Sequence, residues 1–330
     1  MTRIRPTGRA LLGALVSGAL ATGAIGAAAP AEASCFSMFG IGNGNGCTST
    51  LTTYAIALGD GARANAPTLF GGALAIGKNS YATTVTIGIS AFNFATAIGD
   101  DSNAVGYDSL FGVALQLGAG TAGTFGIGNI AIGVAEGLGN QAAVTGVGGI
   151  ALQLGPGTTN TIGTLSLGVG VSPGGNPLTA TNGFGAVALN LLGGGTSQVT
   201  ANGFFSAAAN ILGNDNVVTA EGAGGPGLPN WAFNALGIRN TVKAGPGPLT
   251  LAGSIFQRDA TIRQPNTGFN INGLAIPGVA SVASVASVPR RTVSPAAAKA
   301  SAVAPAATAA TAQRPAAKAV SSRTVRKNTR

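Results

Sequence analysis

The sequence predicts an all-β protein, a β-solenoid of irregular turns in the form of a β-roll or parallel β-helix. The first observation is a short repeat of alternating small and branched residues closed by glycine, which begins with Ala-Ile-Ala-Leu-Gly at 55–59 and recurs at 73–77, 84–88 and 95–99. The second is the abundance of glycine, 54 residues of 330, which opposes long helices. A short strand cannot bury its own apolar face, so the repeats are expected to stack on one another.

The first 33 residues are predicted to be a signal peptide. Three arginines within the first nine residues precede an uncharged, largely apolar run at 10–31, and Ala31-Glu32-Ala33 supplies the small residues that a signal peptidase requires. Cleavage after Ala33 is expected to leave a chain that is secreted or held in the cell envelope or at the cell surface of a bacterium. The alternative is an uncleaved anchor, because the run is just long enough to span a bilayer.

Two cysteines follow the predicted cleavage site. Cys35 and Cys47 are the only cysteines in the sequence, and thiols oxidise in exported proteins, so we expect a disulfide between them. The disulfide is expected to close a glycine-rich N-terminal loop, residues 34–49, and to stabilise the folded state by about 3 kcal/mol in the chain-entropy model. The sequence contains no histidine, so the two cysteines alone do not complete a zinc site, and no metal or other cofactor is expected.

Residues 50–276 are predicted to form the solenoid body. We expect glycines with positive φ at its corners, and Asn140, Asn216 and Asn240 at corners in the left-handed conformation that asparagine tolerates. The irregular spacing of the corners indicates turns with looped-out segments, and 244–276 is expected to form the last turns or a cap. The corner glycines each follow a large apolar residue: Leu117-Gly118, Ile132-Gly133, Leu154-Gly155, Leu167-Gly168, Leu192-Gly193, Leu212-Gly213 and Leu236-Gly237.

Charge is distributed unevenly along the mature chain. Residues 34–288 contain six basic and eight acidic side chains, a net charge of −2, whereas 289–330 contain nine basic side chains and no acidic one. The segment 277–330 is rich in alanine and proline, so it is predicted to be a disordered basic tail. We expect it to bind a polyanion, namely an envelope glycan, an acidic lipid or DNA. The candidate binding residues are Arg290, Arg291, Lys299, Arg314, Lys318, Arg323, Arg326, Lys327 and Arg330.

Two motifs in the first turns resemble repeats of a known family. The pattern Ala-Ile-Gly-x-x-Ser-x-Ala occurs at 75–82 and again at 97–104. With it, residues 55–106 resemble the head repeats of trimeric autotransporter adhesins, which implies a left-handed parallel β-roll that binds a host surface through its body. The glycine–asparagine loops and the segment Ala-Gly-Pro-Gly-Pro-Leu at 244–249 are similar to those of glycine-rich exported proteins of mycobacteria, which implies a cell-envelope address.

Catalytic chemistry is not expected. The absence of histidine removes the commonest general base. Residues 72–78 match a phosphate-binding loop, but Asn79 replaces the Ser or Thr that binds magnesium, and the segment is in phase with the repeat. Asp100 and Asp101 are adjacent, so in an extended chain they point to opposite faces. We therefore predict no enzyme and no small-molecule substrate; the alternative in this class is a β-helix polysaccharide lyase or hydrolase that uses aspartate carboxylates.

Two further motifs bear on binding. Phe204, Phe205 and Trp231 are expected to fill the core or the cap rather than to form a ligand platform, because such rings are usually buried. Thr83-Thr-Val-Thr86 is the best match to the threonine ranks of an ice- or crystal-binding solenoid, a further alternative.

The sequence thus favours an exported structural or adhesion-type β-solenoid of the cell envelope, without catalytic activity. Its body is expected to bind a host-surface ligand, and self-association is compatible with this function. The alternative function is a polyanion-binding protein that acts through its basic tail.

Overall fold

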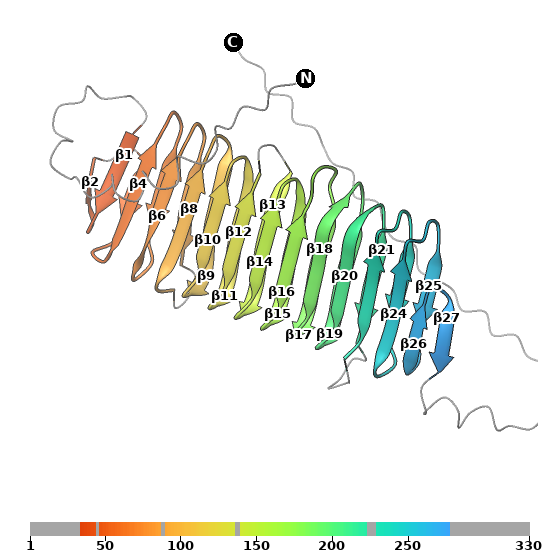
Figure 1. Ribbon diagram of the computed structural model, residues 1–330. Coiled ribbons are helices and arrows are strands. Elements are labelled where there is room, and N and C mark those ends of the chain that lie inside the picture. Colours follow the sequence, from red (N-terminus) through yellow and green to blue (C-terminus); the bar gives the residue numbers. More distant parts are fainter. Residues whose placement is uncertain (1–33, 44–45, 87–89, 136–138, 223–228, 278–330) are drawn as a thin grey trace, which may run out of the picture. The chain divides into compact units, whose positions relative to one another are not determined.

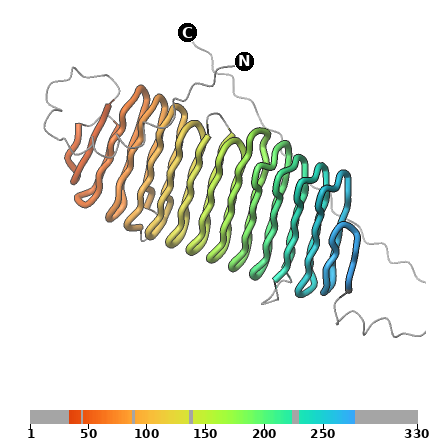
Figure 2. Tube along the Cα trace, viewed as in Figure 1, coloured from red at the N-terminus to blue at the C-terminus, as the bar shows by residue number. Residues whose placement is uncertain are grey.

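The chain forms a β-solenoid, as predicted from its repeats. The computed structural model describes residues 34–277, except for 44–45, 87–89, 136–138 and 223–228. These residues form strands and turns and no helix. Successive strands alternate between two sheets, so each turn of the coil adds one strand to each sheet (Figure 1). The Cα trace shows the same winding as a flattened coil (Figure 2).

Sheet A has 15 strands. Its strands from β4 to β26 are parallel to their neighbours, whereas β1 and β2 at one end and β27 at the other pair antiparallel. In order across the sheet they are β2 (Ile41–Gly42), β1 (Ser34–Met38), β4 (Thr53–Leu58), β6 (Gly71–Ile76), β8 (Asn93–Ile98), β10 (Val113–Leu117), β12 (Ile130–Val134), β14 (Ile150–Leu154), β16 (Leu167–Val171), β18 (Val187–Gly194), β20 (Ala207–Asn214), β22 (Trp231–Ala235), β24 (Thr250–Ile255), β26 (Gly268–Ile271) and β27 (Leu274–Pro277).

Sheet B has 12 strands, each parallel to its neighbours. In chain order they are β3 (Cys47–Ser49), β5 (Arg63–Ala66), β7 (Tyr81–Val85), β9 (Ser102–Leu110), β11 (Gly120–Ile127), β13 (Asn140–Val147), β15 (Gly157–Thr164), β17 (Leu178–Phe184), β19 (Gln198–Phe204), β21 (Val217–Glu221), β23 (Thr241–Ala244) and β25 (Thr261–Gln264).

Alternation along each strand separates a narrow interior from two outer faces. In β4, Ala55 and Ala57 are fully buried between the sheets, while Tyr54 and Leu58 point outward and are exposed. Successive side chains of a strand point to opposite faces, so the small residues line the interior and the large ones cover the outside. Small interior side chains allow the two sheets to approach closely, which explains why alanine dominates the buried positions.

One interior rank changes its chemistry along the chain. We call this rank, the inward positions of sheet A that are in register with Ala57 of β4, the inner rank. The buried apolar residues form two clusters, one within 35–151 and one within 186–262. Buried threonines lie between them on sheet B, at Thr159, Thr161 and Thr179. The inner rank consists of Ala57, Ala75, Ala97, Gln116, Gly133, Gln153, Gly170, Asn190, Asn210, Asn234 and Ser254.

The two cysteines join the sheets at the N-terminal end of the stack. Cys35 lies in β1 and Cys47 in β3; both are buried and bonded to each other, with their Cα atoms 5.5 Å apart. This separation lies in the range that a disulfide requires. Because β1 pairs with β4 and β3 pairs with β5, the strands of the N-terminal segment that the disulfide closes belong to the stack.

Several corner glycines have a different role from the predicted one. Gly118 and Gly155 do have positive φ, as expected. In the later turns, however, the leucine of each pair is left-handed, with φ of 55° at Leu192, and Gly193 is not. A Cβ atom on Gly193 would collide with Oδ1 of Asn190. Glycine is therefore needed there to make room for a buried amide, and the chain turns one residue earlier.

The predicted left-handed conformation of the three corner asparagines is also wrong. Asn140, Asn216 and Asn240 are buried, at most 2% exposed, and none has positive φ. Their amides bond the backbone of the following turns. Nδ2 of Asn240 donates to the carbonyl of Gln257 (2.9 Å), and its Oδ1 accepts from the Ala260 amide (2.9 Å). Turns of the coil leave carbonyl and amide groups unpaired inside the corner, and a buried side-chain amide satisfies both kinds.

Candidate functional site

The outward side chains of sheet A form a continuous apolar face. Strand pairing places them in three ranks from β4 to β26. The first rank is Tyr54, Gly72, Phe94, Val113, Ile130, Ile150, Leu167, Val187, Ala207, Trp231, Leu251 and Phe269. The second is Ile56, Leu74, Thr96, Leu115, Ile132, Leu152, Val169, Leu189, Ala209, Phe233, Gly253 and Ile271. The third is Leu58, Ile76, Ile98, Leu117, Val134, Leu154, Val171, Leu191, Ile211, Ala235 and Ile255. We call these three ranks the apolar face.

The apolar face is large and open to solvent. None of its side chains, all within the described residues, carries a charge. Exposed side chains occur along it, with Leu58 in β4 at 46% and Trp231 in β22 at 54%. At the N-terminal end, β1 adds the exposed Phe36 and Met38. Desolvation by this surface raises the pKa of Tyr54, because burial disfavours the phenolate. Monomeric soluble proteins rarely expose apolar patches of more than a few hundred Å².

The adjoining corner of the later turns adds to this surface. Leu192, Leu212, Leu236 and Phe256 each follow the outward ranks of a sheet A strand, and each is between 44% and 75% exposed. All four have φ near +55°, which is an uncommon conformation for residues other than glycine. The apolar surface therefore continues around the edge of sheet A in the C-terminal turns.

The outer face of sheet B carries both polar and apolar side chains. Amide and hydroxyl side chains, among them Asn103, Thr121 and Gln141, occupy neighbouring outward positions. With residues of the adjacent corner they line a groove of about 480 Å³. Farther along the sheet, Nζ of Lys243 lies 2.8 Å from Oε1 of Glu221. Exposed apolar side chains such as Tyr107, Phe125 and Ile162 also lie on the outside of sheet B, so this face is mixed, whereas the outer face of sheet A is apolar.

Aromatic residues stack at the corners and do not fill the core. Phe92 stacks between Phe70 and Phe111, with ring centroids 5.0 Å apart on each side. Phe204 and Phe205 meet edge to face at 4.6 Å, and Phe205 is 49% exposed. The expectation that Phe204, Phe205 and Trp231 fill the core or cap is therefore wrong, because the interior is too narrow for rings and accepts mainly alanine, valine and small polar residues.

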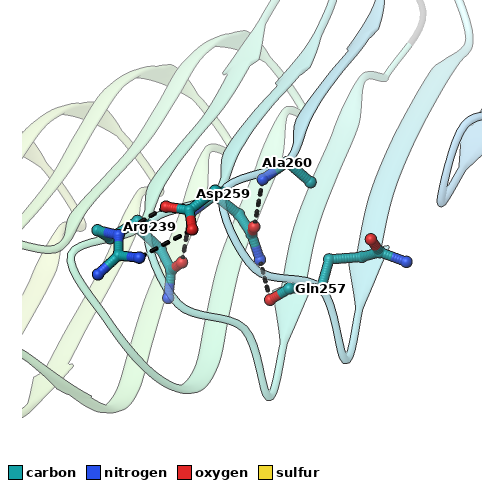
Figure 3. A network of polar contacts seen from close by, with 6 residues as sticks. Arg239, Gln257, Asp259 and Ala260 are labelled. Atoms are coloured by element: carbon teal, nitrogen blue, oxygen red, sulfur yellow. Dashed lines mark hydrogen bonds and ion pairs between the residues drawn. The ribbon is translucent and has the colours of Figure 1, made fainter.

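An ion pair joins two successive corners near the C-terminal end. Nε and Nη2 of Arg239 donate to the carboxylate of Asp259 at 2.6 and 2.8 Å (Figure 3). The hydrogen bond from Arg239 lowers the pKa of Asp259. One turn earlier, the amide and hydroxyl of Thr196 donate to Asp215 and lower its pKa. These groups are exposed, so they connect turns at the surface and do not converge on a pocket.

The segment that matches a phosphate-binding loop and the adjacent aspartates Asp100 and Asp101 are structural parts of the solenoid. Residues 72–76 lie in strand β6, and the Tyr54 ring covers Gly72, so this segment forms no phosphate-binding loop. Asp100 accepts a hydrogen bond from the Lys78 amide of the preceding turn (2.8 Å). Asp101 accepts one from Asn79 (3.3 Å). Both aspartates therefore tie corners together.

The threonine motif of the ice-binding alternative is mostly buried, although Thr86 is exposed. Thr83 and Thr84 are 2% and 0% exposed, so neither presents a hydroxyl to solvent. Thr84 points into the interior, where its hydroxyl lies 3.2 Å from that of Thr68.

Several predicted features lie outside the described residues. These are the signal peptide at 1–33 and the basic tail residues from Arg290 to Arg330. Among the described residues, no cluster of three or more His, Cys, Asp or Glu side chains is arranged to hold a metal ion. No described segment is a helix long and apolar enough to cross a membrane.

Sequence reasoning did not predict the apolar face, although its signal was present. In 113–117, 130–134 and 150–154, large apolar residues occupy the outward positions and the inward positions hold alanine, glycine or glutamine. A strand with one buried face normally shows apolar residues inside and polar ones outside, and these strands reverse the size pattern. No protein-family model, curated protein or solved structure matches this chain.

Proposed function

We propose that this chain is an exported structural, adhesion-type β-solenoid of a bacterial cell envelope or surface, and that the apolar face of sheet A holds it in place there. The apolar face carries this proposal. It offers a long, uncharged surface, which suits attachment over an extended area. A surface of this size and composition typically marks an interaction site.

Two further observations support a location outside the cytoplasm. The sequence begins with the features of a signal peptide, three arginines followed by an uncharged apolar run. Cys35 and Cys47 are placed to form a disulfide, the bond that oxidising compartments outside the cytoplasm favour. Both agree with a protein that works outside the cytoplasm.

The test is to add charge to the centre of the apolar face. Leu152 and Val169 are neighbours in its second rank, and the matched control pair, Asn160 and Ala180, are neighbours on the outside of sheet B. We expect Leu152→Lys with Val169→Lys to lower the envelope-bound fraction about tenfold, because buried unpaired charges oppose attachment. Asn160→Lys with Ala180→Lys is expected to leave it unchanged. Cell fractionation measures both, and equal retention of the two variants contradicts the proposal.

A second candidate function is polyanion binding by the tail. Nine basic side chains and no acidic one lie in 289–330, next to a slightly negative body. Such contacts release counterions, so binding to DNA or acidic vesicles should weaken steeply between about 50 and 200 mM salt. A chain that ends at Val288 should lose this binding. If it binds as tightly as the full chain, the tail is not the binding element.

A further inference from the structure

We infer that the apolar face of sheet A is covered by the same face of a second copy of this chain. The inference rests on the proposed function and names the partner through which the apolar face would hold the chain in place: a second copy, so that the paired chains are retained together. Four observations lead to it: the area of the face, the two aromatic rings that lie flat on it, its lack of charge and the charges along its edge.

The area matches what a stable dimer needs. The apolar face crosses the parallel strands from β4 to β26, so it measures about 50 Å by 15 Å, or roughly 800 Å². Stable interfaces bury about 800 Å² on each partner. A second copy offers a face of the same length, so one contact covers all of it. An interface of this kind is isologous, with the same patch on both chains.

Two aromatic rings of the face lie flat on the sheet, which favours sheet-on-sheet packing. The ring of Tyr54 lies over Gly72 of the next strand, where it occupies the space that a Cβ atom would need. The ring of Phe233 lies over Gly253 in the same way. These two rings thus lie along the sheet, and a hollow of about 310 Å³ beside Trp231, Leu251 and Phe269 leaves room for side chains of a facing sheet. Two sheets pack face to face about 10 Å apart when their side chains form such regular layers.

Charge argues for a protein partner rather than an anionic membrane. Lipid-binding surfaces place Lys and Arg beside their apolar face to meet anionic headgroups. The apolar face carries no charge, so two copies can pack through it without burying a charged side chain. Acidic side chains outnumber basic ones at the described corners that follow the strands of sheet A, with Asp60, Asp100, Asp101, Asp215 and Asp259 against Lys78, Arg239 and Arg258.

The sole tryptophan of the chain provides the readout. Trp231 lies in the first rank of the apolar face and is 54% exposed in one copy. We expect the purified full chain to have at least twice the mass of one chain in sedimentation experiments. We also expect its Trp231 emission to be blue-shifted and protected from acrylamide. On dilution the mass should halve, and emission should shift to the red with the same midpoint.

The lysine pair tests which surface is responsible. Leu152→Lys with Val169→Lys should give a monomer with quencher-accessible Trp231, although the substitutions lie about 15–20 Å from it along the sheet. The control pair Asn160→Lys with Ala180→Lys should behave as the native chain. The dilution series on the native chain needs no variant, so the inference stays testable if a variant does not fold.

Three outcomes overturn the inference. The first is a native chain that is monomeric at every concentration, with Trp231 open to acrylamide. The second is a monomer whose Trp231 becomes shielded only when phosphatidylcholine–phosphatidylglycerol vesicles are added, which assigns the face to lipid. The third is an oligomer that survives the lysine pair, which assigns association to another surface. Envelope retention that depends on the apolar face in a monomeric protein refutes self-association alone, whereas an oligomer without such retention refutes the proposed function alone.

Discussion

The N-terminal and C-terminal halves of the solenoid fill the same inner rank with different chemistry. In the first turns the rank holds Ala57, Ala75 and Ala97, which are fully buried and pack against other alanines. In the later turns Nδ2 of Asn210 donates to Asn190 (2.9 Å), and Nδ2 of Asn234 donates to Asn210 (2.9 Å). Stacked alanines therefore stabilise one half, and a ladder of buried amides stabilises the other.

The outer face of sheet A does not follow this change. It is apolar over the alanine-lined turns and equally apolar over the amide-lined turns, from Ile56 to Ile255. The inner rank therefore changes from alanine to amide side chains, whereas the outer face of sheet A stays apolar. This comparison indicates that the inner rank serves stability and that the apolar face serves an interaction.

The largest effect is expected from moving an amide into the alanine half. Ala75→Asn places a buried amide between Ala57 and Ala97, neighbours in the rank whose side chains offer no hydrogen bond. Orphaned polar groups cost about 1–3 kcal/mol, and overpacking adds a similar amount, so we expect a loss of about 4 kcal/mol. Ser254→Asn, at the end of the same rank beside Asn234, should cost less than about 1 kcal/mol. Urea unfolding measures both, and equal losses contradict the distinction between the halves.

The disulfide is expected to matter next, and only at the N-terminal end. Cys35→Ala with Cys47→Ala opens a loop with a sequence separation of 12 and should cost about 3 kcal/mol. Limited proteolysis should then cut within 34–58 before it cuts in the C-terminal turns. A variant that resists both urea and protease as well as the native chain shows that strand pairing alone closes this end.

Breaking the amide ladder should have a smaller effect. Asn210 accepts hydrogen bonds from both Asn216 and Asn234, so Asn210→Ala leaves buried donors unpaired. We expect a loss of about 2 kcal/mol. Asn190 accepts one such bond, and Asn190→Ala should cost about half as much. If the two variants have the same urea midpoint, the ladder is not the element that stabilises the later turns.

The smallest effect concerns the exposed charged corner of the C-terminal half. The pKa values of Asp215 and Asp259 are lowered in the folded chain by their hydrogen bonds. Lowered carboxyl pKa values stabilise the fold above the ordinary pKa of about 4, and this contribution is lost as the pH falls through the folded values. The melting temperature should therefore drop slightly between about pH 4 and pH 2. Asp215→Asn with Asp259→Asn should flatten this region of the profile, and an unchanged profile contradicts the assignment.

The sequence alone was sufficient for the fold class and the cysteine pair, because periodic glycine and alternating residues directly express short stacked strands. It was insufficient for the corners. Whether Leu192 or Gly193 carries the positive φ depends on the space that Asn190 needs, which only the stacked turns define. The apolar face was missed for a related reason: in β12, isoleucine is as consistent with a core position as with an outer one until the width of the interior is known.

The most direct test of the apolar face as an interaction surface is thiol labelling on intact cells. Both native cysteines are paired, so one added cysteine is the only free thiol among the described residues. Ile132→Cys lies on the outside of sheet A, and Ala143→Cys lies on the outside of sheet B in the same turn. A membrane-impermeant maleimide should label Ala143→Cys on intact cells and Ile132→Cys only after denaturation. Equal labelling of both on intact cells, or labelling of Ile132→Cys alone, would contradict a covered apolar face.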